Sequence, residues 1–352
     1  MTRELKYFEA LREAQDQCMG ADDSVYLMGL GVPDPTGIFG TTKGLQQKYG
    51  AARVMDMPLA ENAMTGIAIG SAMTGMRPVM THQRVDFALV AMEQIVNQAA
   101  KWHYMFDGQH RIPLVIRMII GRGWGQGPQH SQSLQSLFAH IPGLTVLMPT
   151  TAYDAKGMLI AAIESDNPVV MLEHRWLYGI SGAVPEEMYR VTLGKAKVMR
   201  DGVDVTLVGL SYMSLENLRA AELLAERGVS AEVVDLRSLR PLDEETVLAS
   251  VRKTGRLLVA DTANKMFGAS AEIVALVSEK AFGALKDQPA RIALPEYPAP
   301  TSPALSANYY PHASDIAARV LTMMGRDVDD ALFVRPEGQK HDQPDLTFTG
   351  PF

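Results

Sequence analysis

The sequence predicts an α/β protein built from two parallel-sheet domains, and three observations support this prediction. Short runs rich in Val, Ile and Leu alternate with runs of helical periodicity along most of the 352 residues, which is typical of a parallel sheet covered by helices. One run, residues 111–120, is apolar almost throughout, as expected of a strand buried on both faces. The alternation breaks at residues 180–192 and then restarts, which indicates a linker between two domains.

The first predicted domain, residues 1–185, opens with a charged, helix-patterned segment. A helix is expected from about Asn62 to Met76, and a long helix is expected over residues 88–106, where apolar residues recur at positions i, i+3, i+4 and i+7. A further helix over residues 151–165 begins with a Thr/Asp cap. The predicted strands and extended segments are residues 24–32, 53–61, 77–87, 111–120, 144–149 and 168–174.

The second predicted domain, residues 186–325, has its own alternation of strands and helices. Strands are expected within residues 204–211, 230–243, 256–262 and 290–296, and helices at residues 215–228, 244–255 and 270–282. The last segment, residues 326–352, is polar and contains prolines, so it is expected to form an arm or a poorly ordered tail.

The composition excludes several classes of protein. A net charge of −7 argues against nucleic acid or an anionic membrane as the main partner. The single cysteine, Cys18, excludes an internal disulfide framework and fits a reducing compartment. No apolar run approaches the roughly 20 residues of a membrane helix, and the first residues do not read as a secretory signal. A soluble, cytoplasmic protein is therefore expected.

Glu61 is the lone charge in the stretch MPLAENAMTGIAIGSAMTG, residues 57–75. A carboxylate taken out of water is costly unless something pairs with it, so Glu61 is either a helix cap or a group needed for chemistry. Gly66 and Gly70 lie on the helix that follows, where each glycine costs about 0.5–1 kcal/mol relative to alanine. They indicate close backbone packing, either within the domain or at a subunit interface.

The loop GRGWGQGPQHSQS, residues 121–133, follows a predicted buried strand, which is where α/β folds place ligands. It matches neither the dinucleotide fingerprint nor a P-loop, because the glycine spacing differs and no GK[ST] follows. The loop instead presents His130 and Ser131. A lone histidine is often structural, but a position in a glycine-rich loop also suits a functional one. The sequence contains no Cys/His metal cluster and no nucleophile elbow.

Many short blocks of the sequence, in order over about residues 5–320, resemble blocks of a known protein family. They include MPLAENAMTGIAIG, MEQIVNQAAK, YMFDG, PQHSQS, HIPGLTVLMP, DNPVVMLEH, VVDLRSLRPLD and VRKTGRLLVAD. The family is the β subunit of thiamine-diphosphate-dependent 2-oxoacid dehydrogenases, in the transketolase-like superfamily, and residues 85–106 resemble the acetoin-dehydrogenase type more than the pyruvate type. The resemblance implies a thiamine-pyrimidine-binding domain followed by a transketolase C-terminal-like domain.

The resemblance also implies a mechanism. Glu61 matches the family carboxyl group that bonds to the far ring nitrogen of the aminopyrimidine, and His130 matches the histidine that faces the substrate. The resemblance implies three further groups of residues. One group binds the cofactor, one lies on a helix surface that packs two β subunits together, and one provides backbone carbonyls for a monovalent cation such as K⁺. These residues are Leu59, Arg84, Val85 and Phe87 for the cofactor; Gly66 and Gly70 for the interface; and Leu114, Ala162, Ile163, Ser165 and Asn167 for the cation.

One family feature is missing from this chain. The superfamily binds the diphosphate through Mg²⁺ held by a G-D-G motif and a later asparagine, and no such pair is present. The resemblance therefore implies a partner α subunit that holds the diphosphate and Mg²⁺, with the cofactor at the α/β interface of an α2β2 tetramer. A lipoyl acyltransferase core is a further expected partner.

Three parts of the sequence depart from the family pattern. Leu30 and Gly31 replace acidic residues that are thought to relay protons, and residues 260–264, ADTAN, lack an acid often found after that strand. Arg84 replaces an apolar or aromatic residue near the pyrimidine pocket. It is either a surface charge or an anion-binding group that selects a different substrate.

Three functions remain open from the sequence. The first is a decarboxylating or acetoin-cleaving dehydrogenase β subunit that passes an acyl group to a lipoyl carrier. The second is a two-subunit thiamine-dependent ketol transferase or carboligase with another acceptor. The third is a non-catalytic scaffold paralogue, which the changes at Leu30 and Gly31 suggest and the retained Glu61 and His130 oppose.

Overall fold

The computed structural model describes residues 2–123, 125–334 and 340–344. The described residues divide into two compact units, the first formed by residues 2–123 and 137–193 and the second by residues 125–136, 194–334 and 340–344. Each unit is described by itself. The predicted boundary lies between residues 185 and 186.

The first unit is organised around a parallel sheet in which six of its strands follow the order β6-β7-β5-β4-β2-β3. The central strand β5 and its neighbour β7 are buried at every residue, because helices cover both faces of the sheet. The strands are β2 (Val25–Met28), β3 (Val54–Met55), β4 (Arg77–His82), β5 (Val115–Ile120), β6 (Thr145–Leu147) and β7 (Val169–His174).

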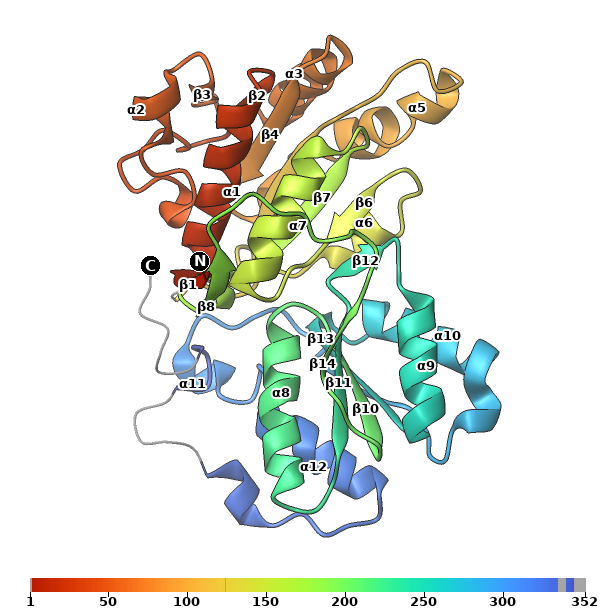
Figure 1. Cartoon of the computed structure of the whole chain (residues 1–352). Helices are drawn as coiled ribbons and strands as arrows, with labels where there is room; N and C mark the ends of the chain where they lie inside the picture. The colour runs from red at the N-terminus through yellow and green to blue at the C-terminus, as the bar shows by residue number, and fades with distance from the viewer. Residues whose placement is uncertain (1, 124, 335–339, 345–352) are drawn as a thin grey trace. The chain divides into compact units, whose positions relative to one another are not determined.

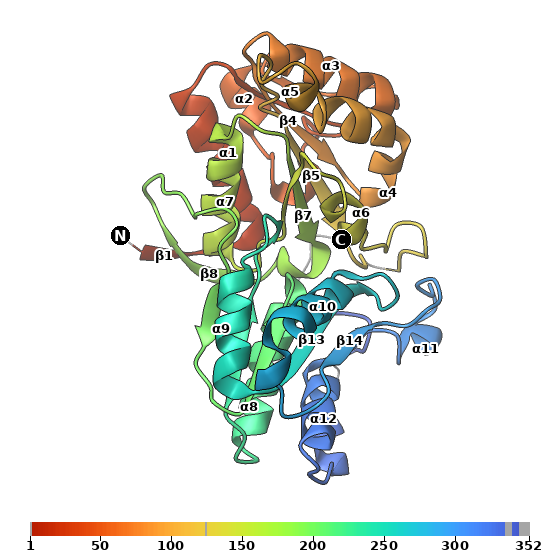
Figure 2. The ribbon, with the colours of Figure 1, turned by 90° about the vertical axis from the view of Figure 1, so that its right-hand side faces the viewer.

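Helices α1 (Tyr7–Ala21) and α7 (Ala152–Glu164) pack together on one face of this sheet, and α3 (Glu61–Met73) and α4 (Val85–Ala88) lie on the other (Figure 2). The predicted Thr/Asp cap of α7 is confirmed, since the side chain of Thr151 accepts a hydrogen bond from the backbone N–H of Asp154. The remaining helices of this part of the chain are α2 (Leu45–Tyr49), α5 (Trp102–Met105) and α6 (Gln135–Ala139).

Two short strands were not expected from the sequence. β1 (Thr2–Lys6) precedes α1 and pairs antiparallel with β8 (Ser181–Pro185). The segment 180–192, expected as an irregular linker, therefore begins with a paired strand.

The predicted long helix over residues 88–106 is wrong, because the segment breaks into α4, a 3₁₀ turn (Leu89–Ala91), a π-helical turn (Gln94–Ala99) and α5. The strand predicted for residues 77–87 also ends early, at His82. Val85 and Ala88 are both buried three positions apart, which is helical spacing that so short a segment does not distinguish from a strand. A Cβ on Gly66 would lie 3.1 Å from Oε1 of Gln94, so α3 packs closely against the π-helical turn.

The second unit is a five-stranded sheet in the order β14-β13-β10-β11-β9, in which only β9 is antiparallel to its neighbour. Helices α8 and α12 pack together on one face, and α9 and α10 pack together on the other (Figure 1). Strand β9 and helix α12 were not expected from the sequence. The elements are β9 (Lys197–Arg200), β10 (Val205–Gly209), α8 (Tyr212–Ala225), β11 (Ala231–Asp235), β12 (Ser238–Arg240), α9 (Glu244–Thr254), β13 (Leu257–Asn264), α10 (Ala269–Ala281), β14 (Ala290–Leu294), α11 (Pro303–Ser306) and α12 (Ala313–Met323).

The described part of the predicted arm or tail packs on the second unit. Leu332 is buried in a 3₁₀ turn (Asp330–Phe333) that contacts α12. The side chain of Ser306 donates a hydrogen bond of 3.1 Å to the carboxylate of Asp342. One buried leucine and a few hydrogen bonds are enough to anchor a segment whose composition is otherwise polar. Residues 335–339 and 345–352 of the predicted tail lie outside the described residues.

Candidate active site at the carboxyl edge of the first sheet

Glu61 is the first residue of α3, and its side chain is largely buried without a described partner. The side chain is 9% exposed, and no described residue forms a hydrogen bond or ion pair with its carboxylate. The N-cap of α3 is Ala60 and makes no side-chain hydrogen bond, so Glu61 is not the N-cap residue. An acidic residue in the first helical turn is favoured by the helix dipole, but this does not replace the lost water. The carboxylate is therefore available to a group that the chain itself does not supply.

A second cluster lies at the carboxyl ends of three adjacent parallel strands. Arg84 follows β4, Gly121 follows β5 and Arg175 follows β7, and these strands are neighbours in the sheet. Open α/β sheets bind ligands at this edge, because the carboxyl ends of all parallel strands meet there.

Arg84 is buried, so its interpretation as a surface charge is wrong. It is 4% exposed, because it follows a strand whose last residues are all buried. Its Nη1 donates a hydrogen bond of 3.2 Å to the carbonyl of Gly121, and its Nε is buried without a partner among the described residues. Burial, and then the like charge of Arg175, lower the pKa of Arg84 to about 10.

Arg175 and Phe39 belong to the same cluster, and the sequence analysis missed both. The guanidinium carbons of Arg175 and Arg84 lie 4.5 and 5.7 Å from the centre of the Phe39 ring. Phe39 has a φ of 54°, which is an uncommon backbone conformation for a bulky residue and is found preferentially at functional sites. Burial lowers the pKa of Arg175 to about 10. The sequence signal for Arg175 is the run EHRWLYG, residues 173–179, in which Arg175 directly follows the predicted strand 168–174.

The histidines at this edge contribute no charge at neutral pH. Burial lowers the pKa of His82 to about 4, and burial together with the charge of Arg84 lowers the pKa of His174 to about 3. A Cβ on Gly121 would lie 2.3 Å from Nε2 of His174, and the φ of Gly121 is +76°. Glycine is therefore required there for the strand end and the imidazole to approach each other.

The remaining predicted cofactor residues have different surroundings. Leu59, two positions before Glu61, is 77% exposed. Val85 is buried in the core of the unit, and Phe87 is half-buried. The first unit thus contains Glu61 and every predicted cofactor residue, with Arg84, Val85 and Phe87 brought together by their closeness in the chain.

His130 belongs to the second unit, where it is half-buried. The segment that carries it is anchored by Gln135, whose side chain donates a hydrogen bond of 2.6 Å to the carboxylate of Asp261 in β13. Asp261 also accepts hydrogen bonds from the backbone N–H groups of Ala263 and Ser270, and its burial raises its pKa. The sequence analysis missed this anchor, because a pairing across 126 positions leaves no local pattern.

Comparisons with known proteins place the chain in a family. Residues 3–180 match the family described as transketolase, pyrimidine binding domain, and residues 194–316 match transketolase, C-terminal domain. The chain is 45% identical over 328 residues to the acetoin:2,6-dichlorophenolindophenol oxidoreductase subunit beta of Cupriavidus necator, with 90% of this chain and 97% of that protein covered. The chain belongs to this family of dehydrogenase β subunits. The family assignment drawn from the ordered sequence blocks is confirmed.

The β subunit resembles pyruvate dehydrogenase subunits almost as closely. It is 43% identical over 318 residues to the pyruvate dehydrogenase E1 component subunit beta-2, mitochondrial, of Oryza sativa subsp. japonica, covering 89% of this chain and 85% of that protein. A solved structure of a split gene transketolase, an inactive beta4 tetramer, matches with a TM-score of 0.74 at 24% identity over 91% of this chain and 99% of that one. This match confirms the fold, and the family is thiamine-diphosphate-dependent.

The two glycines expected at the interface of the β subunit have different environments. Gly66 packs against Gln94 within the chain, whereas Gly70 is exposed with open space around it. Gly70 shares the exposed surface of α3 with Ile67, and further exposed apolar side chains come from neighbouring elements on this side of the sheet (Figure 2). These side chains are Leu59, Leu89, Val90, Tyr104, Met105 and Phe106. An apolar surface of this kind marks an interaction site.

The carbonyls expected to bind a monovalent cation already accept hydrogen bonds in the β subunit. Nη1 of Arg77 donates to the carbonyls of Ile163 and Ser165 at 3.1 and 3.0 Å, and Nη2 of Arg77 pairs with Asp166 at 2.9 Å. A guanidinium cation therefore already contacts two of the five predicted oxygens.

The other three predicted cation ligands are Leu114, Ala162 and Asn167. The carbonyl of Leu114 accepts from the N–H of Val169, and that of Ala162 accepts from the N–H of Ser165. Asn167 is exposed. Each carbonyl retains a second lone pair, so a cation would have to share these oxygens with existing donors.

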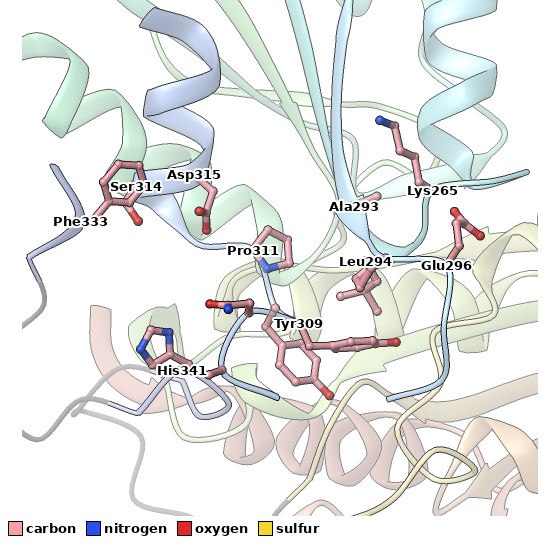
Figure 3. Close-up of a pocket in the computed structure, with 14 residues that line it drawn as sticks. Lys265, Ala293, Leu294, Glu296, Tyr309, Pro311, Ser314, Asp315, Phe333 and His341 are labelled. Atoms are coloured by element: carbon pink, nitrogen blue, oxygen red, sulfur yellow. The ribbon is translucent and has the colours of Figure 1, made fainter. Parts of the chain in front are cut away.

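A pocket of about 460 Å³ lies in the second unit, between the end of β14 and the tail (Figure 3). Glu296 and Asp315 contribute carboxylates to its wall, and both already accept backbone hydrogen bonds, from Met266 and His312. This pocket differs from the surroundings of Glu61, whose carboxylate has no described donor.

No helix in the described part of the β subunit is long and apolar enough to cross a membrane. The described residues also include no cluster of three or more His, Cys, Asp or Glu side chains that could hold a metal ion.

Proposed function

We propose that this β subunit works with an α subunit as a thiamine-diphosphate-dependent dehydrogenase, which cleaves a 2-oxo acid or acetoin-type substrate and passes the acyl group to a lipoyl carrier. The observation that supports this proposal most directly is Glu61, a largely buried residue whose carboxylate has no described partner. A carboxylate in that state is unfavourable unless an external group completes it.

Thiamine diphosphate fits this position. Bound there, the cofactor would supply carbanion stabilisation at its thiazolium ring. The carboxyl group of Glu61 would hydrogen-bond a nitrogen of the aminopyrimidine and hold a proton there. Arg84 and Phe87 would flank the ring from the neighbouring strand end, and His130 would face the substrate.

The α subunit is required by the proposal because the sequence lacks the motif that would hold Mg²⁺ and the diphosphate. The exposed apolar surface around Gly70 and Ile67 supports an interface with a second β subunit or an α subunit in an α2β2 tetramer. A lipoyl acyltransferase core as a further partner and the cytoplasm as the location remain part of the same proposal.

A bound K⁺ is the weakest part of this proposal, because Arg77 already donates to Ile163 and Ser165. A functional K⁺ site would raise the melting temperature in KCl above that in NaCl at equal ionic strength. Equal melting temperatures would remove K⁺ from the proposal.

The ketol transferase and scaffold alternatives are not favoured, since the relatives of this chain are named as oxidoreductase and dehydrogenase subunits.

The test is co-expression with an α subunit, followed by calorimetry with thiamine diphosphate and Mg²⁺ and by assay of acyl transfer to lipoamide. Glu61→Gln should lower turnover by about 10²–10⁴-fold, the range for loss of a group that transfers a proton, with unchanged melting temperature. Glu279→Gln, at an exposed glutamate of the second unit, is the matched control and should keep full turnover. Full turnover of Glu61→Gln would refute the proposed function.

A further inference from the structure

The segment that carries His130 contacts the rest of the second unit on both sides of the histidine. Three positions before it, a Cβ on Gly127 would lie 2.8 Å from Oγ1 of Thr301, so the loop packs closely against that residue. Five positions after it, the side chain of Gln135 reaches strand β13. His130 therefore lies between two points at which residues 125–136 are held by the second unit.

The contact at Gln135 is a set of buried hydrogen bonds. Its Nε2 donates to Oδ1 of Asp261 at 2.6 Å and to Oγ1 of Thr262 at 3.2 Å, and Gln135 and Asp261 are both completely buried. The backbone N–H groups of Ala263 and Ser270 also donate to Asp261, and together these donors favour its ionised form. A hydrogen bond to an ionised acceptor is stronger than one between neutral groups, so Asp261 holds Gln135 firmly in place.

The residues between His130 and Gln135 form a short, constrained connection. Ser131, Ser133 and Gln135 are buried at alternating positions, which is the pattern of an extended segment with one face turned inward. The hydroxyl of Ser131 donates a hydrogen bond of 3.0 Å to the carbonyl of Gln126, and this bond closes a turn that contains His130. A displacement of Gln135 would therefore be passed along the extended segment to the turn.

The polar character of this anchor favours a role in positioning. The carboxylate of Asp261 is out of water, and Oε1 of Gln135 is buried without a partner among the described residues. Both features cost free energy, and two apolar side chains would fill the same space at a lower cost. A hydrogen bond with a charged acceptor has a preferred distance and direction, which an apolar contact lacks. The anchor is therefore suited to fix where the segment lies.

We propose that Gln135 and Asp261 are positioning residues for His130 and set the place of its imidazole in the reaction. This inference rests on the proposed function, in which His130 faces the substrate. Displacing a reacting group by about 1 Å can lower a rate by about 100-fold, because orientation supplies much of the rate enhancement. Loss of the anchor should therefore lower kcat more than it raises KM.

The test is a double-mutant cycle in the complex reconstituted with the α subunit, with acetoin and pyruvate as substrates. Gln135→Met removes the hydrogen-bond donor and keeps the length of the side chain. It should lower kcat by about 10- to 100-fold and change KM by less than about threefold. In a His130→Ala background it should change kcat by less than about threefold, because no imidazole remains to be displaced.

Thr206→Val is the matched control. Thr206 is buried near the amino end of β10, and its hydroxyl forms hydrogen bonds of 2.8 and 2.7 Å with Ser250 and Thr254. The variant loses buried hydrogen bonds of the same unit at a distance from the loop, so its kcat should stay within about threefold of the wild type even if its melting temperature falls.

Thr262→Val is a milder variant of the anchor, for use if Gln135→Met does not fold. It removes only the acceptor at 3.2 Å and keeps the shape of the side chain. It should lower kcat by about two- to fivefold, as expected for one weak hydrogen bond, and this loss should also disappear in the His130→Ala background.

Hydrogen exchange on the full chain gives a readout that does not depend on turnover. The amides of residues 125–136 should exchange at least about tenfold faster in Gln135→Met than in the wild type, and those of β13 should change by less than about threefold.

Three results would overturn the inference. They are an equal loss of kcat in the wild-type and His130→Ala backgrounds, a loss in Thr206→Val as large as that in Gln135→Met, and unchanged exchange of residues 125–136 in Gln135→Met. Each leaves the proposed function intact, because Glu61→Gln tests that function separately.

Discussion

Arg117 and Arg84 are both buried arginines of the first unit, and their charges are compensated in different ways. Arg117, in the middle of β5, donates two hydrogen bonds of 2.6 and 2.9 Å to the carboxylate of Glu173 in β7. Its third hydrogen bond goes to the side-chain oxygen of Gln15, at 3.0 Å, and Tyr178 donates to the carboxylate of Glu173 at 2.5 Å. Arg84 has one hydrogen bond to a neutral carbonyl and a second arginine nearby.

The pKa shifts of the two arginines have opposite directions for this reason. Burial opposes the charge of Arg117, but Glu173 outweighs the burial and the pKa of Arg117 is raised. The pKa of Arg84 is lowered to about 10. The buried ion pair of Arg117 and Glu173 supports the fold, whereas the one described hydrogen bond of Arg84 goes to a neutral carbonyl. The charge of Arg117 is thus compensated within the sheet, and that of Arg84 is compensated less completely.

The largest effect is expected at the compensated pair. Glu173→Gln should lower the free energy of unfolding by about 3–5 kcal/mol, because Arg117 would remain buried without its counter-charge. Denaturant unfolding at pH 7 measures this change. The double variant Arg117→Met, Glu173→Leu should recover most of the stability, since both charges are removed together. A loss below about 1 kcal/mol in Glu173→Gln would contradict the structural role of the pair.

An intermediate effect is expected from pH. The folded chain keeps His82 and His174 unprotonated down to pKa values of about 4 and 3, whereas both histidines of the unfolded chain take up protons near pH 6.5. The unfolded state therefore binds more protons, and stability falls as pH drops from about 6.5 towards 4, by roughly 1 kcal/mol per pH unit for each histidine. Replacing His82 with Gln should reduce this slope, as measured by denaturant unfolding at several pH values. An unchanged slope would show that residues other than His82 take up the protons on unfolding.

The smallest change in stability is expected at Arg84. Arg84→Met removes a buried charge and one hydrogen bond of 3.2 Å, so the free energy of unfolding should change by less than about 1 kcal/mol or increase. The same denaturant titration used for Glu173→Gln measures it. A loss as large as that of Glu173→Gln would remove the distinction between the two arginines and make Arg84 a structural residue.

Several features of the fold and site were predictable because they depend on residues close together in the chain. The strand–helix alternation, the cap of α7 at Thr151 and the isolation of Glu61 in an apolar stretch are all local patterns. Short segments were less predictable. The region 88–106 keeps helical periodicity over its length, but its breaks depend on close packing between α3 and Gln94.

The amino-acid sequence by itself determined the class of fold, the family and the candidate carboxylate Glu61, because each is encoded by periodicity or by contiguous blocks of residues. The tertiary structure decided which charges are compensated. Arg117 and Arg84 are both arginines beside apolar residues in the sequence, and only the pairing of β5 with β7 provides Glu173 for one of them. Arg84, Arg175 and Phe39 come from three distant segments, and the parallel order of the strands brings them to one edge. Charge compensation depends on distances in space, and spacing along the chain does not specify those distances.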